Sequence, residues 1–97
     1  MRTSLADLLA SGRVLLADGA TGTNYFDAGL EAGMAPEVWN LERPEQVLAL
    51  HRAFVDAGAD LILTNSFGCN RHRLKLHDLQ HRTYELARLA AELARSP

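Results

Sequence analysis

Two short, uninterrupted apolar runs limit what this chain can fold into. Val14 to Ala17 form the first run and Leu61 to Thr64 the second, and neither alternates with polar residues. A strand of this kind is covered on both faces, as in a parallel sheet. Parallel strands need a long crossover connection, and the segment between the two runs is long enough to provide one. The runs therefore predict two parallel strands.

A helix is predicted between the two strands. Pro44 suits the first position of a helix, and Gly58 suits the residue that follows its end. Side chains that favour the interior recur between them at helical spacing. They are Val47, Leu48, His51, Phe54 and Val55.

Further helices are predicted at both ends of the chain. Ser4 and Asp7 resemble a capping box that opens a short helix, and Gly12 would stop it. Asp78 is predicted to cap a last helix that runs to about Arg95. Its inner face would carry Leu79, Leu86, Ala90 and Leu93, and its surface an Arg88–Glu92 pair.

The order helix, strand, helix, strand, helix predicts the α/β class, as a barrel or a doubly wound sheet. Both architectures need more strands than this chain of 97 residues supplies. A two-stranded parallel sheet leaves open edges and little apolar cover. We therefore expect residues 1–97 to be an N-terminal fragment of a domain, which would unfold with weak cooperativity or self-associate.

The loop after the first strand is a candidate ligand site, because parallel α/β folds bind ligands at the carboxyl ends of their strands. Asp18 places a carboxylate there, and Gly19 lets the backbone approach a ligand. Free N–H groups of the turn through Thr23 suit a carboxylate or phosphate. The loop lacks the Lys-Ser/Thr ending of a P-loop and the GxGxxG pattern. The alternative is a tight turn whose Asp caps local N–H groups.

The loop after the second strand, Thr64 to Gly68, combines hydrogen-bonding side chains with an aromatic ring. Thr64, Asn65 and Ser66 would orient a small polar substrate against the wall formed by Phe67. The alternative is a loop whose Asn and Ser satisfy backbone groups while Phe67 lies in the core. Spacing alone leaves both open.

The two loops and the segments around them resemble the homocysteine S-methyltransferase family, which includes betaine–homocysteine methyltransferases and the homocysteine-binding module of methionine synthase. The resemblance runs from about Val14 to Arg95. The matching segments are residues 15–23, 36–40, 44–47, 51–60 and 63–68. It implies the first two βα units of a (β/α)8 TIM barrel, a fold of about 250 residues.

The resemblance also implies roles for the loop residues. Asp18 would accept a hydrogen bond from the homocysteine amino group, and N–H groups around Gly19 and Ala20 would face its carboxylate. Thr64, Asn65, Ser66 and Phe67 would line the pocket near the reacting sulfur.

The implied reaction transfers a methyl group to the homocysteine sulfur to give methionine. A thiol with a pKa near 8.5 is a poor nucleophile at neutral pH, and zinc coordination converts it to a thiolate. The resemblance places three zinc-binding cysteines on late barrel strands, beyond Pro97. Cys69 is the one cysteine here and matches no zinc ligand of the family. We therefore expect the isolated chain to be inactive.

Betaine is the favoured methyl donor, followed by S-methylmethionine or a folate–cobalamin route. Residues 73–78 favour the betaine type, and Trp39 is a candidate wall for a quaternary ammonium through cation–π contact. Two other function classes remain open: a non-catalytic interaction module that pairs with another chain, and a small phosphate-binding module built on the first loop.

Composition narrows these alternatives. The net charge is −2 without a basic patch, which gives nucleic-acid binding little support. No apolar run approaches the roughly 20 residues of a membrane span, and the N-terminus lacks the apolar core of a signal peptide. With a single cysteine, these features favour a reduced, cytoplasmic setting. His72, His77 and His81 fit a solvated face better than a metal site.

Overall fold

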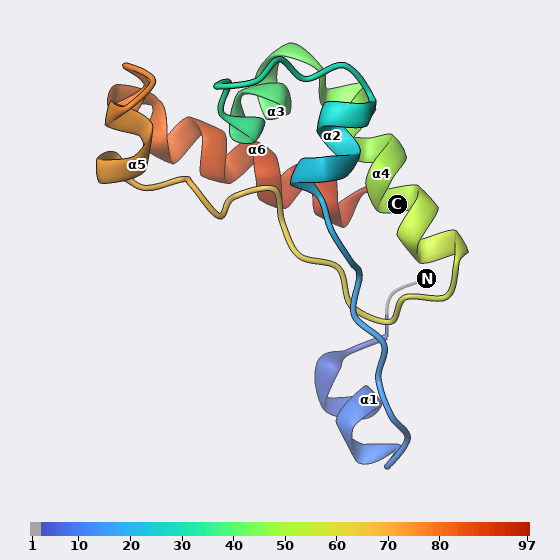
Figure 1. Ribbon diagram of the computed structural model, residues 1–97. Helices are drawn as coiled ribbons and strands as arrows, with labels where there is room; N and C mark the ends of the chain where they lie inside the picture. The colour runs from blue at the N-terminus through green and yellow to red at the C-terminus, as the bar shows by residue number, and fades with distance from the viewer. Residues whose placement is uncertain (1–2) are drawn as a thin grey trace.

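A computed structural model describes residues 3–97 as an elongated molecule of 44 × 26 × 19 Å (Figure 1). Helices dominate it, and two extended segments join α1 to α2 and α4 to α5. The helices are α1 (Leu5–Ala10), α2 (Gly22–Asp27), α3 (Trp39–Glu42), α4 (Pro44–Asp56), α5 (Arg71–Lys75) and α6 (Thr83–Arg95). Two 3-10 turns, η1 (Pro36–Val38) and η2 (Gln80–Arg82), precede α3 and α6.

The ends of α1 and α4 confirm the helix signals of the sequence. The hydroxyl of Ser4 accepts a hydrogen bond from the N–H of Asp7, as an N-cap should. Pro44 occupies the first turn of α4, and Gly58 follows its end with a φ of +108°. Glycine adopts that conformation without the steric penalty that a Cβ would bring.

The prediction that Asp78 caps the last helix is wrong, because α6 begins at Thr83. Asp78 has a φ of +56° and lies in the turn that closes α5, where the N–H of Leu79 bonds to the carbonyl of Leu74 at 2.9 Å. A short polar side chain tolerates this left-handed conformation better than most residues do. Asp78 therefore marks the end of α5 and not the start of α6.

The inner face predicted for the last helix is confirmed at Leu86, Ala90 and Leu93, whereas Leu79 lies before α6. Leu86 and Ala90 are fully buried, and α6 packs against α3 and α4. On the outer surface Arg88 and Glu92 pair at 2.7 Å, with both side chains about half exposed. Such a pair contributes only a few tenths of a kcal/mol.

The two apolar runs lie side by side and parallel. A single bridge pairs Ala17 with Leu61, so residues 3–97 contain parallel pairing without a longer regular strand. The N–H of Leu61 bonds to the carbonyl of Leu16 at 3.1 Å, and the N–H of Asp18 bonds to the carbonyl of Leu61 at 2.9 Å. The barrel itself stays a prediction.

Asp60 stabilises one end of the paired segments through its side-chain hydrogen bonds. Its Oδ2 accepts the N–H of Leu16 at 2.9 Å, and its carboxylate takes both terminal nitrogens of Arg13, at 2.7 and 3.1 Å. The guanidinium and the N–H of Leu16 hold the pKa of the Asp60 carboxyl below its usual range. The ionised carboxylate thus bridges the two segments at their start.

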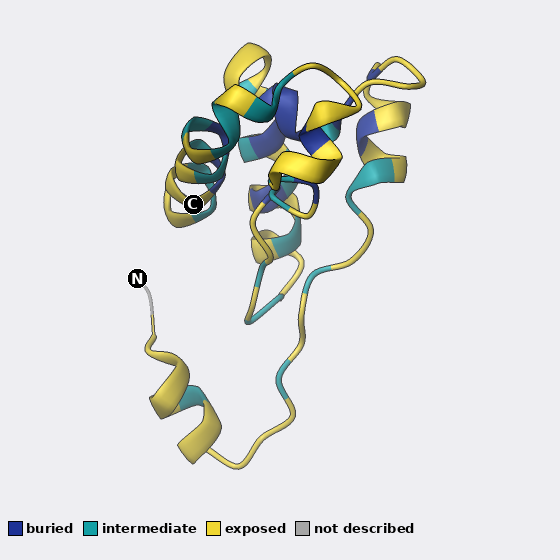
Figure 2. Ribbon diagram, turned by 90° about the vertical axis from the view of Figure 1, so that its left-hand side faces the viewer, coloured by how far each residue is buried: buried dark blue, intermediate teal, exposed yellow. Residues whose placement is uncertain are grey.

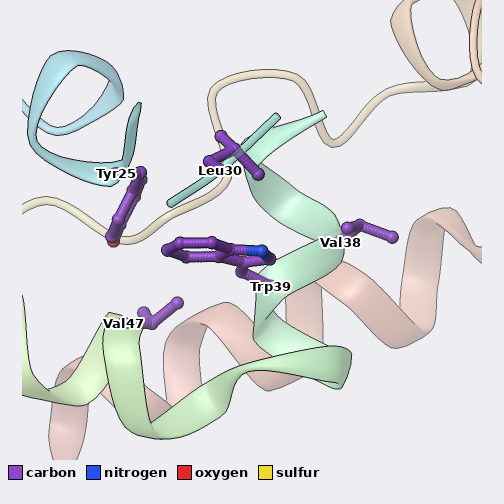
Figure 3. Close-up of a cluster of buried hydrophobic side chains, with 5 residues drawn as sticks. All are labelled: Tyr25, Leu30, Val38, Trp39 and Val47. Carbon is purple, nitrogen blue, oxygen red and sulfur yellow. The ribbon is translucent and has the colours of Figure 1, made fainter. Parts of the chain in front are cut away.

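The core lies among the helices and not around the extended pair. Tyr25, Leu30, Val38, Trp39 and Val47 form its centre (Figure 3). The rings of Tyr25 and Trp39 meet edge to face, with centroids 5.5 Å apart. Figure 2 shows this buried centre within the helical part, while α1 stands apart and contributes no buried residue.

Apolar side chains of the extended segments face solvent. Val14 is 93% exposed and Leu63 is 69% exposed, whereas the sequence predicts strands covered on both faces. The helices that the structure describes leave these side chains uncovered. Across residues 3–97, no helix has the length and apolar character needed to cross a membrane.

Replacing Asp60 by Ala should loosen the parallel pair, because the N–H of Leu16 and the guanidinium of Arg13 lose their shared acceptor. We expect faster hydrogen exchange at the amides of Leu16, Asp18 and Leu61, measured by NMR. Asp56→Ala, at the exposed end of α4, is the matched control and should leave these amides unchanged. Equal protection in Asp60→Ala would show that the bridge does not depend on this carboxylate.

Candidate functional site

Asp18 stands where the two extended segments end, and its side chain takes part in their pairing. In a regular parallel ladder the N–H of Leu63 would bond to the main-chain carbonyl of Asp18. Here it bonds to Oδ2 of the Asp18 carboxylate instead, at 3.1 Å. Within residues 3–97 no hydrogen bond reaches Oδ1. One oxygen is therefore fixed by the protein, and the other is available to a ligand.

The turn after Asp18 lies close against α4. A Cβ added to Gly19 would come within 3.3 Å of the Phe54 ring, so glycine fits this approach better than larger residues. The amide of Asn24, in α2, donates to the carbonyl of Ala20 at 2.6 Å. These contacts fix the turn at Gly19 and Ala20 directly after Asp18.

The second loop divides into residues that face different ways. Thr64 and Ser66 hydrogen-bond to each other through their hydroxyls on the accessible side. Asn65 is buried, and its amide donates to the carbonyl of Pro36 at 2.9 Å and to Oδ1 of Asn40 at 3.0 Å. Asn65 thus joins the loop to η1 and α3 and agrees with the alternative in which it satisfies polar groups.

Phe67 lies at the surface, so the alternative that places it in the core is wrong. Its side chain is 87% exposed, and the guanidinium of Arg73 lies 5.6 Å from its ring centroid. A cation–π contact this exposed contributes about 0.5–1 kcal/mol. An exposed aromatic ring can contact another segment or a ligand. The predicted substrate pocket requires an accessible ring of this kind.

Three buried residues were not predicted as site residues: Tyr25, Glu37 and His51. Their exposed fractions are 1%, 6% and 1%. Burial raises the pKa of Tyr25 to about 12, and the carboxylates of Asp18 and Glu37 add to this effect. Burial lowers the pKa of His51, while the Asp18 carboxylate acts in the opposite direction. The helical spacing of His51 predicted its burial but not its electrostatic link to Asp18.

Glu37 reaches the second loop through Gly68. The N–H of Gly68 donates to Oε2 of Glu37 at 3.3 Å, and a Cβ on Gly68 would come within 2.7 Å of Oε1. This contact joins η1 to the end of the predicted substrate loop. Sequence spacing gives no indication of it, because Glu37 precedes Gly68 by a long interval.

Trp39 packs the segment after the first loop, as predicted. It is 7% exposed and its ring lies against Tyr25 (Figure 3). Its second suggested role, as a wall for a quaternary ammonium, stays a prediction.

Metal-binding side chains are scattered. Over the described part of the chain, no three His, Cys, Asp or Glu residues are grouped to hold a metal ion. Cys69 is half-buried, and burial, followed by the nearby Glu37 charge, raises its thiol pKa to about 11. His72, His77 and His81 are exposed.

The parallel pairing of the two extended segments ends at the Asp18 carboxylate. A sequence profile described as Homocysteine S-methyltransferase matches residues 15–96. The chain belongs to the homocysteine S-methyltransferase family.

Two relatives are named methionine synthase. The proteins from Mycobacterium leprae (strain TN) and Mycobacterium tuberculosis (strain ATCC 25618 / H37Rv) are each 38% identical to this chain over 101 residues. The alignments cover 96% of this chain but only 8% of each relative. The chain therefore spans a small part of the length of these proteins.

Replacing Asn65 by Ala should destabilise the fold, because Oδ1 of Asn40 and the carbonyl of Pro36 lose their donor. Leaving buried acceptors unsatisfied costs about 1–3 kcal/mol. Ser66→Ala, one residue further on, should change the free energy of unfolding by about 0.5 kcal/mol or less. Urea unfolding followed by circular dichroism measures both. An Asn65→Ala variant as stable as Ser66→Ala would contradict the structural role of Asn65.

Tyr25 should make the fold sensitive to alkaline pH. Its pKa is higher in the folded chain than in the unfolded chain, where it is about 10. Folding stability is therefore complete below pH 10 and falls as the pH rises toward 12, by at most roughly 3 kcal/mol. Thermal melts of Tyr25→Phe should show a shallower decline over this range. Tyr84→Phe, which alters the exposed tyrosine, should keep the original slope.

Proposed function

We propose that this chain contributes the homocysteine-binding end of a homocysteine S-methyltransferase, which forms methionine by methyl transfer to sulfur. The observation that carries the proposal is the Asp18 carboxylate, held through Oδ2 by Leu63 N–H with Oδ1 open. The chain belongs to the homocysteine S-methyltransferase family, and homocysteine carries a primary ammonium. An ammonium binds best to an anionic acceptor, and the Asp18 carboxylate can serve as that acceptor.

The residues around Asp18 suit the rest of the amino acid. Oδ1 of Asp18 would accept an ammonium N–H, and the turn at Gly19 and Ala20 would offer backbone N–H groups to the carboxylate. Thr64 and Ser66 lie on the accessible side of the neighbouring loop. They would face the body of the substrate, with the exposed ring of Phe67 beside them.

The chemical step needs more than these residues. The homocysteine sulfur reacts well only as a thiolate, and zinc coordination is one way to lower a thiol pKa. The side chains present do not fit a zinc site, because Cys69 is the sole cysteine and residues 3–97 contain no group of three His, Cys, Asp or Glu side chains that could hold a metal ion. We therefore propose that the zinc ligands lie on segments outside residues 1–97 and that this chain alone binds without turnover.

The segments proposed to lie outside residues 1–97 would also complete the fold. The exposed side chains of Val14, Leu16 and Leu63 belong to the extended pair, and further βα units of a (β/α)8 barrel would cover them. These residues are where self-association is expected when the chain is alone. Betaine remains the favoured donor, and the proposed setting is the cytoplasm.

A chimera tests this function. This chain would replace the aligned segment of the Mycobacterium tuberculosis methionine synthase, and methionine formation from homocysteine would be measured. We expect activity in the chimera, none in the isolated chain, and at least a tenfold loss of kcat/KM in the chimera carrying Asp18→Asn, because the amide has no negative charge to pair with the ammonium.

Asp27→Asn, an exposed acid in α2, is the matched control and should retain activity. Full activity with Asp18→Asn would rule out the proposed role of this carboxylate. A folded but inactive chimera with native Asp18 would count against the function itself.

A further inference from the structure

Glu37 and Arg73 contact two consecutive residues at the end of the second loop. The carboxylate of Glu37 accepts the N–H of Gly68 at 3.3 Å, and the guanidinium of Arg73 lies 5.6 Å from the centroid of the Phe67 ring. Glu37 belongs to η1 and Arg73 to α5, so two separate elements meet at this point. Both elements therefore influence where the Phe67 ring lies.

Glu37 is a buried carboxylate without a cation. Its exposed fraction is 6%, and none of the ion pairs formed by residues 3–97 includes it. Within the same residues, the N–H of Gly68 is the one donor that reaches its side chain. A buried negative charge is most stable when a cation or several donors accompany it. Glu37 can therefore accept a cation in addition to its present hydrogen bond.

A small cavity connects Glu37 with Arg73. Its volume is about 160 Å³, and its lining includes Glu37, Gly68, Arg73, Leu74 and His77. Leu74 is 1% exposed and anchors α5, whereas Arg73 is exposed. An arginine side chain is long, and its planar guanidinium can donate two hydrogen bonds to one carboxylate. A change of side-chain conformation would bring Arg73 to Glu37 across this cavity.

We propose that Arg73 is a positioning residue with two alternative partners. It lies over Phe67 while the ring is free, and it pairs with Glu37 when a ligand or another segment takes the ring. The purpose of this exchange rests on the proposed function, in which Phe67 borders the substrate, but the exchange itself does not. An exposed cation–π contact is weak and easily displaced, and the ion pair with a buried carboxylate offsets its loss.

The thiol of Cys69 reports which partner Arg73 has. Burial raises the pKa of this thiol to about 11, and the negative charge of Glu37 adds to the effect. When Arg73 pairs with Glu37, its positive charge offsets the carboxylate and the thiol pKa falls. A larger fraction of Cys69 is then thiolate at a given pH, and the thiolate is the form that alkylating reagents attack.

The test measures the rate at which iodoacetamide alkylates Cys69, the sole cysteine of the chain, at a pH of about 8.5. Phe67→Leu removes the ring, so Arg73 should move to Glu37 and the rate should rise about threefold or more. In an Arg73→Gln background the same substitution should leave the rate unchanged. Arg71→Gln is the matched control background, because Arg71 is exposed on the same helix and outside the cavity lining. It should preserve the acceleration.

Three results would overturn the exchange. The first is an unchanged rate in Phe67→Leu. The second is an equal acceleration with and without Arg73, because the leucine would then act by exposing Cys69. The third is a parent chain whose Cys69 reacts as fast as free cysteine, because the buried arrangement would then be absent in solution. None of these measurements involves homocysteine or turnover, so an inactive chimera would contradict the proposed function and leave the exchange in place.

Discussion

The site depends on a parallel pairing that two aspartates extend beyond its single bridge. Asp60 accepts the N–H of Leu16 at one end, and Asp18 accepts the N–H of Leu63 at the other. Between them only the backbone bonds around Ala17 and Leu61 hold the segments together. Carboxylates accept stronger hydrogen bonds than carbonyl groups, so a very short pairing is reinforced at both ends. The direction of the Asp18 side chain is a consequence of this arrangement.

The helical core provides the rigid support for that pair. Tyr25 and Trp39 meet edge to face at its centre, and the Asn40–Asn65 hydrogen bond ties the second loop to it. The same core also contains groups that a stable fold would avoid, because Tyr25 and His51 each keep a buried polar atom without a partner.

Local signals in the sequence predicted α1, α4 and most of α6, but not α2, α3 or α5. Ser4, Pro44 and Gly58 act through backbone geometry that depends on near neighbours, so their meaning could be read directly. The prediction at Asp78 was wrong because aspartate suits both an N-cap and a left-handed turn, and the sequence does not distinguish the two. Asp18 and Gly19 could be proposed as site residues because they follow a buried-type run.

The sequence did not predict contacts between residues that lie far apart in the chain. Asn65 and Phe67 lie in one loop, yet the Asn65 side chain enters the core and the Phe67 side chain faces solvent. These orientations depend on the positions of Asn40 and Arg73. The burial of Tyr25 and the contact of Glu37 with Gly68 appear only when the helices and the second loop come together.

The most direct test is a crystal structure of a complete domain containing this chain with L-homocysteine bound. The account predicts the amino nitrogen at about 3 Å from Oδ1 of Asp18, with the N–H of Leu63 still bonded to Oδ2. An amino nitrogen held by other residues, with Asp18 Oδ1 facing only solvent, would contradict it.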